Sequence, residues 1–211
     1  ADTLEYWDEL YADRTSPWDT LYGYEDIQFA ITSLIPAQQR ERCRVLHVGC
    51  GTSNVTEGLW KDGFRSICNF DFSDVVIRLM AQRWEDAAKG AATGDEEAAM
   101  LQGVEWLQLD ITDLAPLAGG SFDVVLEKFT LDALLCEVTD DATSDRGCAA
   151  MREMHRVLRP GGLLLSIAWG EGRRVDLLKS GGLFDVESRR VPGTAAQRPL
   201  VYICKKTARQ G

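Results

Sequence analysis

A glycine turn and an acidic residue further along the chain indicate a binding site for a ligand that carries a ribose. Gly49 and Gly51 follow the apolar run 45–48, and Asp71 ends a second apolar run twenty residues beyond Gly51. Glycine permits a sharp turn and lets a ligand approach the backbone where a Cβ would collide. A carboxylate at the end of the second strand can accept hydrogen bonds from both ribose hydroxyls. The spacing therefore predicts a site for an adenosine-containing cofactor.

Neighbouring residues complete this predicted site. Phe72 offers an apolar face to an adenine, and Asp110, after a third apolar run, can accept a hydrogen bond from the adenine amino group. Ser73 or Asp74 is suited to cap the following helix, which leaves the ribose carboxylate free. Asn54 stands where the dinucleotide fingerprint needs its third glycine, and this counts against NAD or FAD.

Short aliphatic runs alternate with helical stretches and predict the sheet that positions these residues. The predicted strands are 44–48, 66–70, 104–109, 122–126, 162–168, 183–189 and 200–204. Unbroken apolar runs are typical of parallel strands covered on both faces. Too few residues separate the last two strands for a parallel crossover, so they should form an antiparallel hairpin. We expect an α/β fold with a doubly wound, mostly parallel, seven-stranded Rossmann-like sheet.

The whole chain, residues 1–211, is expected to form one domain. The Ala-, Gly- and Glu-rich stretch 84–102 is interpreted as a helix end and a mobile insertion without chemistry of its own. Residues 139–146 are predicted to be a polar loop before a helix at 146–158, which Pro and Gly then end.

Composition limits the partners. The formal net charge of −10 argues against nucleic acid, because binding a polyanion depends on Lys and Arg, and a basic protein would complement it better. Six cysteines without a C-x-x-C pair and two histidines predict no metal site. We expect no membrane partner, since no apolar run could span a bilayer. A cytoplasmic location is expected, or the mitochondrial matrix if a transit peptide is missing from this chain.

Four segments resemble the ordered motifs of class I S-adenosylmethionine-dependent methyltransferases. They are Val-Gly-Cys-Gly-Thr-Ser, Asp-Phe-Ser, Leu-Asp-Ile and Arg-Val-Leu-Arg-Pro-Gly-Gly, and they fall within residues 44–168. The resemblance implies S-adenosylmethionine as methyl donor and S-adenosylhomocysteine as product. It also agrees with the predicted hairpin, because that fold ends its parallel sheet with a reversed strand.

A narrower resemblance rests on Leu-Glu-Lys-Phe-Thr-Leu-Asp-Ala-Leu at 126–134 and on the aromatic segments 5–11 and 18–24. These are similar to the protein-lysine methyltransferases of elongation factor 1-alpha and of mitochondrial citrate synthase. The resemblance implies that residues 1–40 form a helical segment that closes the cofactor site. It also implies ten cofactor-binding residues: Trp7, Tyr11, Gly49, Cys50, Gly51, Asp71, Phe72, Asp110, Ile111 and Lys128. The chain departs from the pattern at Phe129, where these relatives have glycine, and at His47, which precedes the glycine turn and is interpreted as structural.

The function expected from this resemblance is methyl transfer to a lysine side chain of a protein. The acceptor-side candidates are Glu127, Phe129, Thr130 and Asp132. Two other functions stay open: methylation of a small molecule, and binding of the cofactor without turnover. Local alternatives also stay open, because the N-terminal aromatic residues could be an amphipathic helix packed on the sheet, and Glu127 could form an ion pair with Lys128.

Overall fold

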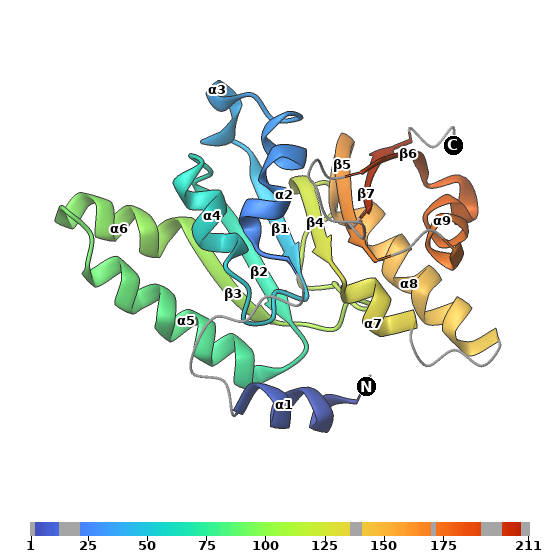
Figure 1. The fold of residues 1–211 in the computed structure, drawn as a ribbon, viewed down its shortest axis with the longest axis horizontal. Coiled ribbons are helices and arrows are strands. Elements are labelled where there is room, and N and C mark those ends of the chain that lie inside the picture. Colours follow the sequence, from blue (N-terminus) through green and yellow to red (C-terminus); the bar gives the residue numbers. More distant parts are fainter. Residues whose placement is uncertain (1–2, 13–21, 136–140, 170–171, 191–199, 208–211) are drawn as a thin grey trace.

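A seven-stranded β-sheet forms the centre of the molecule (Figure 1). The structure is a computed structural model, and it describes residues 3–12, 22–135, 141–169, 172–190 and 200–207. The strands are β1 (Arg44–Val48), β2 (Ser66–Asp71), β3 (Val104–Gln108), β4 (Phe122–Lys128), β5 (Leu158–Ala168), β6 (Phe184–Arg190) and β7 (Leu200–Lys206). Their order across the sheet is β3-β2-β1-β4-β5-β7-β6, which confirms the predicted seven-stranded fold.

Strand direction also matches the prediction. Strands β1 to β5 run parallel, whereas β7 runs antiparallel to both β5 and β6. The residues that connect β6 to β7, 191–199, lie outside the described residues. The strand order changes direction between β1 and β4, and in open sheets of this kind ligands bind at the carboxyl ends of the strands beside such a point.

Helices cover both faces of the sheet. They are α1 (Leu4–Ala12), α2 (Tyr24–Thr32), α3 (Ala37–Arg40), α4 (Val55–Lys61), α5 (Asp74–Lys89), α6 (Gly94–Gly103), α7 (Thr130–Leu135), α8 (Asp141–Val157) and α9 (Gly172–Lys179). Alternate residues of β1 point to opposite faces: Val45 packs in one core with α2, α4, α5 and α6, and Leu46 packs in another with α7, α8 and α9. None of the helices in the described part of the chain is long and apolar enough to cross a membrane.

The helix end predicted within residues 84–102 is confirmed, but the mobile insertion predicted after it is wrong. Helix α5 continues to Lys89, and a second helix, α6, follows it. Thr93 caps α6 by accepting a hydrogen bond from the amide of Glu96, and the indole of Trp84 donates to the carbonyl of Met100 at 3.0 Å. This tertiary contact and the cap stabilise a helix that composition alone did not indicate.

Two predicted boundaries between 139 and 162 are also wrong. Helix α8 begins at Asp141, so residues 141–146 belong to its first turns and are not a loop. Acidic residues are in general favoured in the first turn of a helix, so the acidic composition of this segment is also compatible with an earlier helix start. At the other end, β5 begins at Leu158 and includes the Arg-Pro-Gly-Gly segment, where its register with β4 is irregular and Gly161 has φ 73°.

Gly58 allows α2 and α4 to pack closely. A Cβ on Gly58 would lie 2.1 Å from Cδ1 of Tyr24, whose hydroxyl donates to Asp62 at 2.6 Å and whose amide donates to Asn54 at 2.8 Å. We therefore expect Gly58→Ala to lower the free energy of unfolding by about 1–3 kcal/mol in urea denaturation. The control Gly94→Ala meets no atom within 4 Å, so it should leave stability unchanged or raise it. Equal effects of the two substitutions would contradict this packing.

Candidate active site

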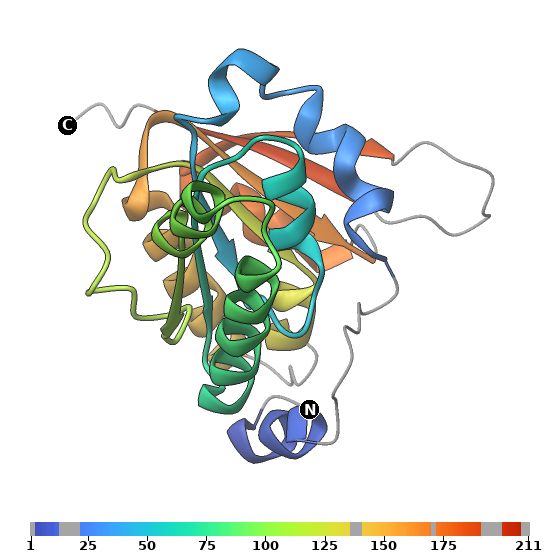
Figure 2. The ribbon, with the colours of Figure 1, turned by 90° about the vertical axis from the view of Figure 1, so that its left-hand side faces the viewer.

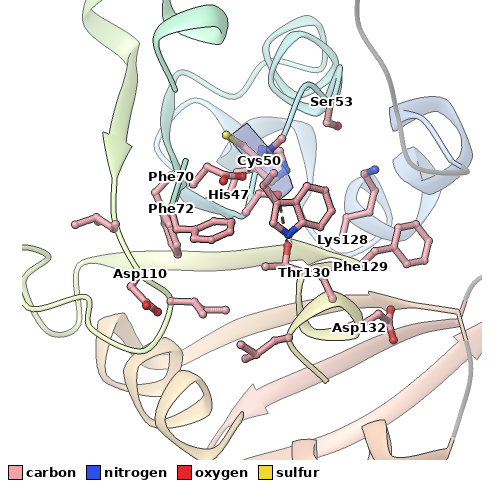
Figure 3. A pocket seen from close by; sticks show the side chains of 18 of the residues that line it. His47, Cys50, Ser53, Phe70, Phe72, Asp110, Lys128, Phe129, Thr130 and Asp132 are labelled. Atoms are coloured by element: carbon pink, nitrogen blue, oxygen red, sulfur yellow. Dashed lines mark hydrogen bonds between the residues drawn. The ribbon is translucent and has the colours of Figure 1, made fainter. Parts of the chain in front are cut away.

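A pocket of ≈ 370 Å³ opens at the carboxyl ends of β1, β2 and β4 (Figure 3). This volume is typical of small-molecule sites. All ten residues predicted to contact the cofactor line it: Trp7, Tyr11, Gly49, Cys50, Gly51, Asp71, Phe72, Asp110, Ile111 and Lys128. Three of the four acceptor-side candidates, Phe129, Thr130 and Asp132, line the same pocket. In Figure 3, Phe72 and Asp110 lie at one end, and Phe129 and Asp132 lie at the other.

The turn after β1 needs glycine at two positions. Gly49 and Gly51 have φ of 57° and 49°, in the left-handed region. A Cβ on Gly49 would lie 2.4 Å from Oγ1 of Thr130, which donates a hydrogen bond to the carbonyl of Val48 at 3.0 Å. A Cβ on Gly51 would lie 3.2 Å from the hydroxyl of Tyr11. The turn therefore fits closely between α1 and α7, and the left-handed φ of both glycines confirms the sharp turn that their spacing predicted.

Asp71 is a buried carboxylate at the wall of the pocket, with 3% of its surface exposed. Its Oδ2 accepts from the amide of Gly51 at 3.0 Å, and its Oδ1 accepts from the amide of Ser73 at 3.1 Å. Burial raises the pKa of Asp71 to about 6, although the backbone hydrogen bonds oppose this rise. Ser73 supplies the cap of α5, since its Oγ accepts from the amide of Val76. As predicted, capping does not require Asp71.

Asp110 lies after β3 in a fixed orientation. Its Oδ1 accepts hydrogen bonds from the amide and the hydroxyl of Thr112 at 2.8 and 2.7 Å. Its Oδ2 lies 4.0 Å from the guanidinium of Arg146, which also lines the pocket. The carboxylate is half-exposed, so a ligand in the pocket can still reach it.

Helix α1 brings two aromatic side chains to the pocket. The rings of Trp7 and Tyr11 stack with their centroids 5.6 Å apart, and Tyr11 is buried. The hydroxyl of Ser73 donates to Asp8, and α1 lies beside α5 (Figure 2). Helix α1 therefore packs on the fold and also lines the pocket. The two interpretations of these aromatic residues, helix packing and cofactor contact, are compatible.

Phe129 adopts a backbone conformation that glycine prefers. Its φ is 62°, and no other non-glycine residue in the described part of the chain has a positive φ. This conformation costs about 1–2 kcal/mol in a residue with a Cβ. The ring is buried, with its centroid 6.3 Å from that of Tyr22 and 5.5 Å from Nζ of Lys128. Phenylalanine thus keeps the turn that glycine would make and adds a ring to the pocket wall.

Glu127 is not among the residues that line the pocket. It is fully buried, and its carboxylate accepts hydrogen bonds from the amide of Leu131 at 3.1 Å, from the hydroxyl of Ser166, and from Arg174 at 2.7 Å. Burial raises the pKa of Glu127, and the guanidinium of Arg174 opposes the rise. The ion-pair partner of Glu127 within the described part of the chain is Arg174 and not Lys128.

Sequence reasoning missed several residues that line the pocket, including His47, Arg146 and Trp169. His47 is buried, with Nδ1 3.1 Å from Oδ1 of Asn69, so it has the expected structural contact and also reaches the pocket wall. Its place two residues before Gly49 was a usable signal, as was the place of Trp169 directly after β5. Arg146 gave no signal in the sequence, because only the packing of α8 in the folded protein brings this side chain to the pocket.

Comparison with known proteins finds similar sequences and similar folds. A family model described as "Methyltransferase domain" matches residues 46–166. The chain is 30% identical over 171 residues to EEF1A lysine methyltransferase 4 of Bos taurus, covering 78% of this chain and 60% of that protein. It is 30% identical over 166 residues to the Bos taurus eEF1A lysine and N-terminal methyltransferase, covering 79% and 21%. The chain thus spans less than two thirds of either relative.

A third relative and two solved structures extend the comparison. The mitochondrial citrate synthase-lysine N-methyltransferase of Pongo abelii is 30% identical over 170 residues, covering 77% of this chain and 68% of that protein. The N-methyltransferase NodS of Bradyrhizobium japonicum, solved with S-adenosyl-l-homocysteine, has a TM-score of 0.65 at 17% identity and covers 99% of this chain and 100% of its own. The [4+2]-cyclase SpnF has a TM-score of 0.61 at 16% identity and covers 97% and 93%.

The two structural likenesses show the fold alone, and a fold can host more than one reaction. The family assignment rests on the sequence matches, since the family model covers more than half of the chain and the relative from Pongo abelii is matched over 68% of its length. The chain belongs to the family of class I S-adenosylmethionine-dependent methyltransferases.

Proposed function

We propose that this chain transfers a methyl group from S-adenosylmethionine to a lysine side chain of a protein. The observation that carries the proposal is that one pocket joins two ends of different chemistry (Figure 3). One end holds the glycine turn and the buried Asp71. The other holds the partly exposed carboxylate of Asp132, near Phe129 and 3.4 Å from the backbone nitrogen of Trp169. The names of the three sequence relatives support a protein lysine as the acceptor.

The donor end fits S-adenosylmethionine. Asp71 would accept hydrogen bonds from the ribose hydroxyls, and Asp110 would accept one from the adenine amino group. Phe72 and Ile111 would contact the adenine faces, and both line the pocket. When bound, S-adenosylmethionine supplies an electrophilic methyl group on a positively charged sulfur. The protein's task is to align donor and acceptor and to exclude water, and the product is S-adenosylhomocysteine.

The substrate lysine must react as a neutral amine at the acceptor end, so its ammonium must first release a proton to solvent. The carboxylate of Asp132 would orient the amine by accepting a hydrogen bond from it, and it would raise the pKa of the lysine. Desolvation beside Phe129 and Trp169 would lower that pKa. Thr130 has a different task, because its hydroxyl donates to the carbonyl of Val48. Turnover should therefore rise with pH until the lysine is neutral.

The proposal includes one methyltransferase domain in which residues 1–40 close the donor end. The contacts of Trp7 and Tyr11 with the pocket support this role for α1, as does the hydrogen bond between Asp8 and Ser73 at the start of α5. The partner would be a folded protein with a basic surface, since the chain carries a net charge of −10.

A labelling assay tests the proposed function. The chain is incubated with tritiated S-adenosylmethionine and a cell lysate, and the products are separated into small molecules and gel-resolved proteins. We expect label in one or a few protein bands and none with heat-inactivated enzyme. Label confined to small molecules would instead support a small-molecule methyltransferase. Donor binding by calorimetry with no label in either fraction would support a noncatalytic cofactor-binding protein.

A further inference from the structure

Arg174 links three elements of the fold beneath the acceptor end of the pocket. It comes from α9, is 3% exposed, and donates through Nη1 to Glu127 on β4 at 2.7 Å and to Ser166 on β5 at 3.2 Å. Its Nη2 lies 2.8 Å from Oδ1 of Asp132 on α7. The guanidinium thus bridges two carboxylates that differ in solvent exposure: the side chain of Glu127 is 0% exposed, and that of Asp132 is 33% exposed.

This network runs from the core to the pocket. Asp132 lines the pocket, whereas Glu127 and Arg174 are not among the lining residues. The remaining oxygen of Asp132 is Oδ2. Within the described ranges it accepts a hydrogen bond from the backbone nitrogen of Trp169, and this bond is long, at 3.4 Å. One oxygen of Asp132 is therefore held by the buried cation, and the other can accept a further donor.

Stability alone is a poor reason for this arrangement. Removing charged groups from water costs several kcal/mol per ion in general, and well-packed apolar residues often stabilise a protein as well as a buried ion pair does. What the network does provide is a fixed position for Asp132, since hydrogen bonds to Glu127 and Ser166 hold the guanidinium, and its Nη2 forms an ion pair with Oδ1 of Asp132. Glu127 in turn forms an ion pair with Arg174 inside the core.

We infer that Arg174 is a positioning residue of the acceptor site: anchored on Glu127, it holds the Asp132 carboxylate toward the amine that is to be methylated. The inference rests on the proposed function and extends it. Arg174 acts through Asp132 and does not touch the donor end, so its replacement should affect the acceptor and not the donor.

Steady-state kinetics with the protein labelled in the lysate assay, purified as acceptor, test this role. We expect Arg174→Gln and Asp132→Asn each to lower kcat/KM for the acceptor by about 10- to 100-fold. The double variant should be no worse than Asp132→Asn alone, because residues that act as a unit are not additive. The affinity for S-adenosylhomocysteine should stay within about twofold of the wild-type value, since Arg174 lies outside the donor end. Lys179→Gln, which removes an exposed charge from the same helix, should match the wild type.

Arg174→Gln leaves Glu127 buried without its cation and can unfold the protein. A second variant, Glu127→Gln with Arg174→Gln, removes both charges and still deprives Asp132 of its partner, so it should fold and show the same loss. Arg174→Lys should restore part of the activity. The inference would be overturned if the losses caused by Arg174→Gln and Asp132→Asn multiplied in the double variant. Wild-type acceptor kinetics in the folded variant with both Glu127→Gln and Arg174→Gln would also overturn it. A wild-type enzyme that labels no protein would overturn the proposed function, and with it this role.

Discussion

Replacing Asp71 by asparagine should weaken the binding of S-adenosylhomocysteine by more than about tenfold in calorimetric titration, because charge-assisted hydrogen bonds of about 1.5–3 kcal/mol each are lost from a buried site. The fold should survive. The pKa of Asp71 in the folded state, about 6, lies above the ordinary 3.8, so ionised Asp71 destabilises the protein at neutral pH by up to about 3 kcal/mol. Asparagine removes this penalty and leaves one backbone N–H unpaired at a similar cost of about 1–3 kcal/mol.

The pH dependence has a definite sign. Affinity for S-adenosylhomocysteine should fall as the pH is lowered through about 6, because the protonated carboxyl is a weaker acceptor. Asp74→Asn is the matched control, since Asp74 is more exposed and pairs with Arg78 on the surface of α5; it should bind like the wild type. Unchanged affinity in a folded Asp71→Asn variant would mean that this carboxylate serves only to fix the turn at Gly51.

Replacing Phe129 by glycine should change which acceptor is methylated, or how fast, while donor affinity stays within about threefold of the wild type. The ring lies at the proposed acceptor end of the pocket (Figure 3). Stability should fall, because losing a buried aromatic side chain costs about 3–5 kcal/mol, and the relief of left-handed strain returns only about 1–2 kcal/mol. Lysate labelling, donor calorimetry and urea denaturation give the three readouts.

Phe129→Ala is the matched control, because it removes the ring and keeps the strain. It should be less stable than Phe129→Gly by about 1 kcal/mol and should show the same change of acceptor. A Phe129→Gly variant that loses donor binding but keeps its acceptor profile would contradict the assignment of this residue to the acceptor end.

The sheet and the gathering of the cofactor-binding candidates around one pocket could be predicted because their signals are local. A buried parallel strand shows as an unbroken apolar run, and the glycine turn and the following acids fall at the strand ends in chain order. Their meeting at one edge then follows from the sheet topology. Asn54 indicated against a dinucleotide fingerprint, and in the structure its side chain accepts a hydrogen bond from the amide of Tyr24 on α2.

The acceptor end could not be predicted to the same depth, because it depends on contacts between distant segments. Glu127 and Asp132 look alike in sequence, yet one points into the core and the other lines the pocket. Arg174 comes from α9, far along the chain, and no local pattern indicates that it binds both carboxylates. The left-handed φ of Phe129 was likewise hidden, although the glycine expected there was its indirect sign.

The central claim, methyl transfer to a protein lysine, is tested most directly by peptide mass spectrometry. The wild-type chain and Asp71→Asn are incubated in parallel with a cell lysate and S-adenosylmethionine that carries a deuterated methyl group. We predict deuterated methyl groups on the Nζ of one or a few lysines in the wild-type sample and a strong reduction with Asp71→Asn. Deuterated methyl groups that appear only on small molecules or on other side chains, with no lysine modified, would contradict the claim.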